Sequence, residues 1–97
     1  MRVVWTVPAA RDLEDIGDYI ARHNPSAAQR TVQRIRTRTR TLARHPCLGR
    51  PGRVTGTREL VVTSTPFIVA YRVVDAGIEI LAVFHGARIW PDTFERT

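Results

Sequence analysis

The residues of this chain that can do chemistry gather in its second half, in a Pro/Gly-rich loop and the three β-type segments after it. Most are arginines, whose guanidinium groups bind anions through paired hydrogen bonds. One is a histidine, which exchanges protons near neutral pH. The pattern predicts a compact sheet that grips an anion or a charged partner. The residues are Arg50, Arg53, Arg58, Arg72, His85 and Arg88.

The charge balance of the chain is strongly positive, with 15 basic residues against 9 acidic ones and a net charge of +6. Every basic residue is an arginine, because lysine is absent. Arginine stays charged and is a poor proton donor, so acid–base chemistry falls to His, Glu, Asp, Tyr or the single Cys. The charge fits nucleic acid, an acidic protein partner or an acidic surface equally well.

Length and composition predict one domain spanning residues 1–97, with room for a single core. Cys47 is the only cysteine, which excludes an internal disulfide and a cysteine-type metal cluster. The sequence shows neither a signal peptide nor a membrane span, so a soluble, cytoplasmic protein is expected. The three histidines lack ligand spacing, and we expect no metal and no cofactor.

Apolar spacing in the first half predicts a strand over residues 2–6 and two amphipathic helices, over residues 8–23 and 25–44. Asn24–Pro25 separates the helices, with Asn as cap and Pro at the first helical position. The seam of the second helix consists of Ala28, Val32, Ile35, Thr39 and Leu42. Six arginines project from its opposite side, where a solvated face or a footprint for nucleic acid or a protein partner is expected.

A Pro/Gly loop over 45–56 precedes strands predicted at 58–64, 67–74 and 78–85. The element order is therefore β-α-α-β-β-β. This order predicts an α+β fold, in which a helix hairpin packs on one face of a small, mainly antiparallel sheet.

A two-residue turn at Ala76–Gly77 would pair Asp75 with Ile78 and set the faces of the last two strands. The core side would then carry Phe67, Val69, Tyr71, Val73, Ile78, Ile80, Ala82 and Phe84. The other side would carry Arg72, Glu79 and His85 among apolar residues. That second face is too apolar to be left bare to water, so we expect it to be covered.

With this element order, four motifs resemble those of the RelE/ParE family of bacterial toxins, and the resemblance covers nearly the whole chain. They are Leu48–Arg53, Gly56–Leu60, Tyr71–Val73 and Glu79–His85. The resemblance implies the toxin of a type II toxin–antitoxin module, of the kind linked to plasmid stabilisation. It also implies a co-expressed, acidic antitoxin whose C-terminal segment wraps the toxin and supplies a cover for the second face.

The family joins two activities on one fold, and fold alone does not choose between them. RelE-like members cut messenger RNA in the ribosome, whereas ParE-like members inhibit DNA gyrase without established catalytic residues. A metal-independent endoribonuclease would use His85 as a proton carrier with Arg58, Arg72 and Arg88 around the phosphate. A second proton carrier is missing, since Trp90 stands near the position of the C-terminal Tyr of RelE-like sites.

The strand motifs look closer to ParE-like sequences, which favours gyrase inhibition over the nuclease. Arg50 and Arg53 in the loop and Trp90 near the C-terminus are the candidate binding residues for an anion or partner. Whether the protein is an enzyme stays open. A third alternative, a non-toxic basic binding module on the same fold, also remains.

Overall fold

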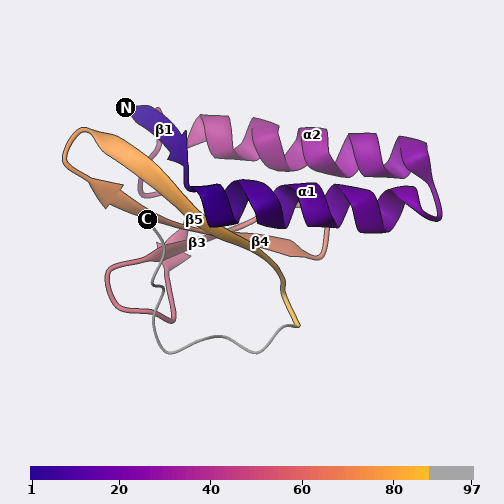
Figure 1. The fold of residues 1–97 in the computed structure, drawn as a ribbon. Helices are drawn as coiled ribbons and strands as arrows, with labels where there is room; N and C mark the ends of the chain where they lie inside the picture. The colour runs from indigo at the N-terminus through magenta and orange to yellow at the C-terminus, as the bar shows by residue number, and fades with distance from the viewer. Residues whose placement is uncertain (88–97) are drawn as a thin grey trace.

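Two helices lie side by side across one face of a five-stranded sheet (Figure 1). The computed structural model describes residues 1–87. Its sheet runs in the order β1-β5-β4-β3-β2 and is antiparallel except for β1, which lies parallel to β5. The elements are β1 (Arg2–Trp5), α1 (Val7–Ala21), α2 (Pro25–Thr41), β2 (Arg50–Pro51), β3 (Arg58–Val61), β4 (Phe67–Val74) and β5 (Gly77–His85). The predicted α+β fold is confirmed, and the two-residue strand β2 is added to it.

Both helices begin at polar caps followed by a proline in the first turn. The side chains of Thr6 and Asn24 each accept a hydrogen bond from a backbone N–H of the helix that follows, at 3.3 and 3.1 Å. The Thr6 hydroxyl also donates to the Ile80 carbonyl (2.8 Å), which ties the start of α1 to β5. Within residues 1–87, neither helix combines the length and hydrophobicity needed to cross a bilayer.

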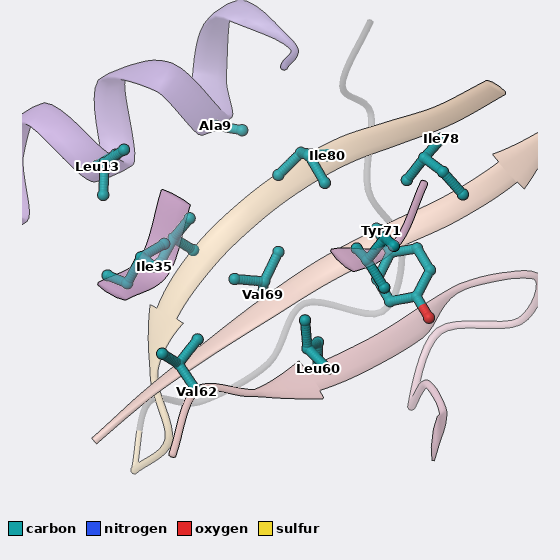
Figure 2. Packing of buried hydrophobic residues seen from close by; sticks show 11 residues of the cluster. Ala9, Leu13, Ile35, Leu60, Val62, Val69, Tyr71, Ile78 and Ile80 are labelled. Carbon is teal, nitrogen blue, oxygen red and sulfur yellow. The ribbon is translucent and has the colours of Figure 1, made fainter. Parts of the chain in front are cut away.

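The core lies between the helix pair and the sheet (Figure 2). The predicted seam of α2 is confirmed, because Ala28, Ile35, Thr39 and Leu42 are buried and Val32 packs partly against the core. Full burial of one such aliphatic side chain stabilises the fold by roughly 1.5–3 kcal/mol. The core side chains are Ala9, Leu13, Ile35, Leu42, Leu60, Val62, Val69, Tyr71, Ile78, Ile80 and Val83.

The turn between β4 and β5 differs from the expected one. Val74 pairs with Gly77, so the two turn residues are Asp75 and Ala76 rather than Ala76 and Gly77. Asp75 has a φ of 42°, in the left-handed region that Asp tolerates better than most residues. The expected pairing of Asp75 with Ile78 is therefore wrong, since Val73 is the residue that pairs with Ile78. A shift of two residues keeps every side chain on its own side of the sheet, so the faces of the strand ends are unchanged.

A register shift further along β5 does change the faces. Tyr71 pairs with Ile80 and Ala70 with Ala82, so Leu81 is an extra residue without a partner of its own on β4. Because one extra residue reverses the alternation, Val83 joins the core beneath the helices. The expectation that Ala82 and Phe84 lie on the core side is wrong for this reason.

Ala82 and Phe84 instead form a separate buried cluster with Ala70 on the face of the sheet away from the helices. Their exposed fractions are 0%, 3% and 0%, so this part of the second face is not bare to solvent. The bulged region is also held from the helix side. β1 pairs with β5 only as far as Ile80, and beyond it Asp12 of α1 accepts a hydrogen bond from the Val83 N–H (3.1 Å).

Candidate functional site

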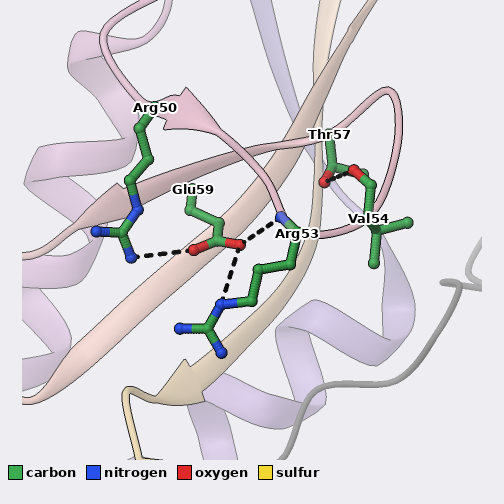
Figure 3. Close-up of polar contacts among 5 residues, drawn as sticks. All are labelled: Arg50, Arg53, Val54, Thr57 and Glu59. Atoms are coloured by element: carbon green, nitrogen blue, oxygen red, sulfur yellow. Dashed lines mark hydrogen bonds and ion pairs between the residues drawn. The ribbon is translucent and has the colours of Figure 1, made fainter.

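One buried carboxylate organises the arginine loop (Figure 3). The Glu59 side chain is only 1% exposed, and its Oε1 accepts a hydrogen bond from Arg50 Nη2 at 3.1 Å. Its Oε2 accepts from the Arg53 backbone N–H at 2.9 Å and lies 3.8 Å from Arg53 Nε. Both guanidinium side chains stay about half exposed, at 54% and 50%. The cluster therefore combines two cations with one carboxylate, which leaves it with a net charge of +1.

The short strand β2 explains how these groups meet. Arg50 pairs with Glu59 across the antiparallel β2–β3 ladder, so the two side chains share one face of the sheet. Glu59 in turn pairs with Ala70, which belongs to the cluster remote from the helices. The Arg50–Arg53–Glu59 cluster thus lies on the second face of the sheet.

The side chain of Tyr71, on the core side of the sheet, holds the other end of the loop at Pro46 and Gly49. The Tyr71 hydroxyl accepts from the Gly49 N–H and donates to the Pro46 carbonyl, each at 2.8 Å. Arg58 Nη1 donates to the Gly49 carbonyl at 2.8 Å. A Cβ on Gly49 would lie 2.7 Å from Tyr71 Cε1 and 2.8 Å from the Glu59 carbonyl, so only glycine fits there. These contacts form a clamp on the loop.

The environment of Tyr71 changes its proton affinity. Burial raises the pKa of Tyr71 above its usual value of 10.0, against the opposing effects of the Gly49 N–H hydrogen bond and the Arg58 charge. The phenol consequently stays protonated and keeps donating to Pro46 throughout the physiological pH range.

Arg72 lies on the second face but is engaged there. It pairs with Glu79 across β4 and β5, and its Nε donates to Glu79 Oε1. The side chains are 41% and 29% exposed, so solvent screens this ion pair and it contributes about 0–1 kcal/mol to stability.

His85 lies on the helix side of the sheet because of the bulge at Leu81. It pairs with Phe67, which packs against the core, and the two rings meet edge to face with centroids 5.9 Å apart. The exposed imidazole accepts a hydrogen bond from the Ala87 N–H at Nδ1 (3.1 Å). The Nδ1 lone pair is engaged by this bond, so only Nε2 remains to exchange a proton with another group.

The predicted site residues do not converge on one surface. Arg50, Arg53 and Arg72 belong to the second face, whereas Arg58 pairs with the core residue Tyr71 and His85 lies beside Phe67. The expectation that His85 shares a face with Arg72 is wrong, and the bulge is the cause. Arg88 and Trp90 lie outside the described residues.

Two residues that organise the site carried no functional prediction, namely Glu59 as the anchor of the loop and Tyr71 as its clamp. A sequence signal exists for Glu59, since it is the first acidic residue after Asp18 in an arginine-rich stretch. No group of three or more His, Cys, Asp or Glu in residues 1–87 is arranged to hold a metal.

Comparison with known proteins gives consistent matches over most of the chain. The family described as "ParE toxin of type II toxin-antitoxin system, parDE" matches residues 3–90. The "Putative toxin Y4kP" of Sinorhizobium fredii is 47% identical over 90 residues, which is 93% of each chain. "Toxin RelE2" of Caulobacter vibrioides is 42% identical over 88 residues, covering 91% of this chain and 98% of that protein.

A solved structure agrees with the sequence relatives. The "Chromosomal ParDE TA system from P. aeruginosa" contains a chain with a TM-score of 0.81 and 33% identity, covering 88% of this chain and 95% of that one. The family match, the two sequence relatives and the solved structure thus indicate the same class of protein. The protein belongs to the ParE family of toxins of type II toxin–antitoxin systems.

Proposed function

We propose that this toxin is a ParE-like growth inhibitor that acts on DNA gyrase and is neutralised by a cognate, acidic antitoxin. The family match and the two toxin relatives support the class. For the target, the observation that carries the proposal is the division of the nuclease candidates between two faces of the sheet.

RNA cleavage through a 2′-hydroxyl needs a base, an acid and cationic stabilisation around one phosphate. Here Arg72 lies across the sheet from Arg58 and His85. Arg58 donates to Gly49, and Nδ1 of His85 accepts from Ala87. This arrangement favours a protein that acts by binding its target over one that cleaves a phosphodiester.

The Arg50–Arg53–Glu59 cluster supports an acidic antitoxin as partner. Glu59 holds both guanidinium groups in place before binding, so less side-chain entropy is lost when a carboxylate arrives. The half-exposed groups remain accessible for paired hydrogen bonds to such a carboxylate.

The test is to induce the chain in bacterial cells and follow plasmid topology and transcript ends in the same culture. Gyrase inhibition predicts relaxed or cleaved plasmid with intact transcripts. Co-expression of the antitoxin is the control and should restore both supercoiling and growth. Codon-phased transcript breaks with normal supercoiling would reject the gyrase target.

A ribosome-dependent messenger RNA endonuclease is the second candidate, favoured by the relative named RelE2. It requires His85 to carry protons. We therefore expect His85→Ala to retain full toxicity if gyrase is the target and to lose it if the protein is a nuclease. A thermal melt of the purified variant checks that folding is preserved.

An Arg50→Gln/Arg53→Gln variant tests the partner surface separately. It should bind the antitoxin more weakly, with a smaller salt dependence, since two charge-assisted contacts are removed. An Arg2→Gln/Arg11→Gln variant, which removes the same charge from β1 and α1, is the matched control. Equal weakening by both variants would show that only net charge matters.

A further inference from the structure

The exposed face of α2 carries a block of positive charge that the proposed function does not use. No acidic residue occurs between Asp18 and Glu59, a stretch that includes all of α2. The arginines of α2 and its C-terminal turn therefore have no carboxylate on their own helix to pair with. They are Arg30, Arg34, Arg36, Arg38, Arg40 and Arg44.

The rest of the described structure does not supply partners either. The acidic groups of α1 form no ion pair with α2, and no side chain of the six arginines makes a hydrogen bond or ion pair within residues 1–87. Folding even leaves Arg38 Nε buried without a hydrogen-bond partner. The five exposed arginines are thus available to an acceptor from outside, whereas Arg38 is partly buried and its Nε is not accessible.

Three of them form a row that winds slowly around α2. Arg30, Arg34 and Arg38 follow one another at four-residue intervals, which places them on one side of α2 with a rise of about 6 Å per step. We name these three residues the arginine stripe. Like charges at this spacing destabilise a helix by about 0.2–0.5 kcal/mol per pair, so the stripe does not serve the stability of the fold.

The stripe borders a polar depression of about 200 Å³ between α2 and the turn that joins β3 to β4. Arg30, Arg34 and Thr31 line it from the helix, and Ser64 and Thr65 line it from the turn. Ser64 adopts a left-handed φ of 68° in that turn. Two guanidinium groups and the hydroxyl-bearing residues Thr31 and Ser64 therefore surround a space large enough for one phosphate group. The Thr65 hydroxyl is already engaged, because it donates to the Val62 carbonyl and accepts from the Phe67 N–H.

The arginine stripe also lines an apolar hollow of about 920 Å³ with Gly17, Ala28 and Val32, so the polar depression is the part of its surroundings that favours a phosphate. Protein interfaces are anchored by aromatic and apolar side chains in well-packed pockets. Contacts to a phosphate backbone instead come from arginine together with Ser and Thr hydroxyl groups, as in this depression. A regular row of guanidinium groups also matches a polymer with evenly repeated charges.

We propose that the arginine stripe, together with the β3–β4 turn, binds the phosphodiester backbone of nucleic acid, with one phosphate seated in the depression. The contact is independent of base sequence, because it involves only backbone charges. It lies on the helix side of the sheet, away from the Arg50–Arg53–Glu59 cluster. It does not depend on gyrase being the target.

The test measures binding of the full chain to a short labelled DNA duplex by fluorescence anisotropy over a range of salt concentrations. The Arg30→Gln/Arg34→Gln/Arg38→Gln variant should bind on the order of a hundredfold more weakly at moderate salt. Its plot of log affinity against log salt should be shallower by about 0.9 for each lost phosphate contact, or roughly 1.8 for the phosphate shared by Arg30 and Arg34 and a second one at Arg38.

The matched control is Arg2→Gln/Arg11→Gln/Arg22→Gln, which removes three exposed arginines outside α2 and changes the net charge equally. It should keep nearly all of the affinity. Thermal melts establish that both variants are folded. Equal losses in the two variants, or no loss in the stripe variant, would overturn the proposal.

Two further ligands identify the source of the anion. Tighter binding of duplex DNA supports DNA as the natural ligand, and tighter binding of single-stranded RNA supports RNA by the same backbone chemistry. Poly-glutamate tests an acidic protein instead. If it binds as tightly as nucleic acid and depends equally on the stripe, the surface is an acidic-protein site and the proposal is wrong.

Discussion

The loop before β3 and the exposed face of α2 are both rich in arginine, but they hold this side chain in opposite ways. In the loop, Arg50 and Arg53 meet the buried carboxylate of Glu59. On α2, the arginines make no side-chain hydrogen bond or ion pair within the described residues. The difference teaches that an arginine contributes to the fold only where the topology brings a carboxylate within reach of its guanidinium group.

In this chain Glu59 lies far beyond the end of α2 and directly across the ladder from Arg50. The loop arginines therefore contribute to the fold as well as to a binding surface. The α2 arginines contribute nothing evident to the fold. Substitutions in the two regions should accordingly differ in their effects on the free energy of unfolding.

The largest effect is expected at the clamp of the loop. Gly49→Ala would place a Cβ against Tyr71 and the Glu59 carbonyl, so the loop must move and its hydrogen bonds to Tyr71 must break. We expect the free energy of unfolding to fall by about 3 kcal/mol, as measured by urea denaturation. Gly77→Ala is the control, since its nearest heavy atom lies at 3.4 Å. Equal costs at the two positions would contradict the clamp.

Removal of the loop's carboxylate should have the next largest effect. Glu59→Ala removes the acceptor of the Arg53 N–H and of the Arg50 guanidinium, together with the carboxylate beside the Arg53 guanidinium. Since both arginine side chains are half exposed and can turn to water, we expect a loss of about 2 kcal/mol rather than the larger cost of a fully buried pair. Glu79→Ala, which breaks the exposed pair with Arg72, should cost less than about 1 kcal/mol. Similar losses of stability in Glu59→Ala and Glu79→Ala would mean that the buried carboxylate contributes no more than the exposed one.

Much of this scaffold is predictable from sequence because the signals are local. The Asn24–Pro25 boundary, the seam around Ile35 and the β4 strand each follow from neighbouring residues, and each is present. A cap, a helix period and an apolar run need no knowledge of distant partners.

The bulge at Leu81 is different, because residues 80–84 are all apolar and show no alternation from which a face can be assigned. The two residues of β2 are likewise too short to produce a pattern. The positions of His85 and of the Glu59 anchor depend on these two features. The candidate site was for this reason harder to predict than the fold around it.

The Tyr71 hydroxyl should contribute less than Glu59. Tyr71→Phe leaves the Gly49 N–H and the Pro46 carbonyl without their partner, at a cost of about 1.5 kcal/mol near neutral pH. Tyr19→Phe, at a 64% exposed tyrosine, should cost nothing measurable.

The same substitution should change the response to alkali. The pKa of Tyr71 is higher in the folded protein than in the unfolded chain, so the folded state is fully favoured below pH 10.0 and loses that stability as pH rises further. Urea denaturation at a series of pH values should show a steeper loss above pH 10.0 for the native protein than for Tyr71→Phe. Identical slopes would mean that burial does not raise this pKa.

The smallest effect, and one of opposite sign, is expected on α2. Arg34 has an arginine four residues away on both sides, at Arg30 and Arg38, whereas Arg36 has only Arg40 at that spacing. Arg34→Gln removes two such pairs and should therefore raise the free energy of unfolding by about 0.4–1 kcal/mol, and Arg36→Gln, which removes one, by about half as much.

Because the cause is repulsion between exposed charges, both gains should vanish at high salt, where the Debye length falls to about 3 Å. Thermal melts at low and high ionic strength provide the measurement. A loss of stability in Arg34→Gln at low salt would mean that Arg34 has a partner that supports the fold. The stripe would then resemble the Glu59 cluster, and the contrast between the two regions would fail.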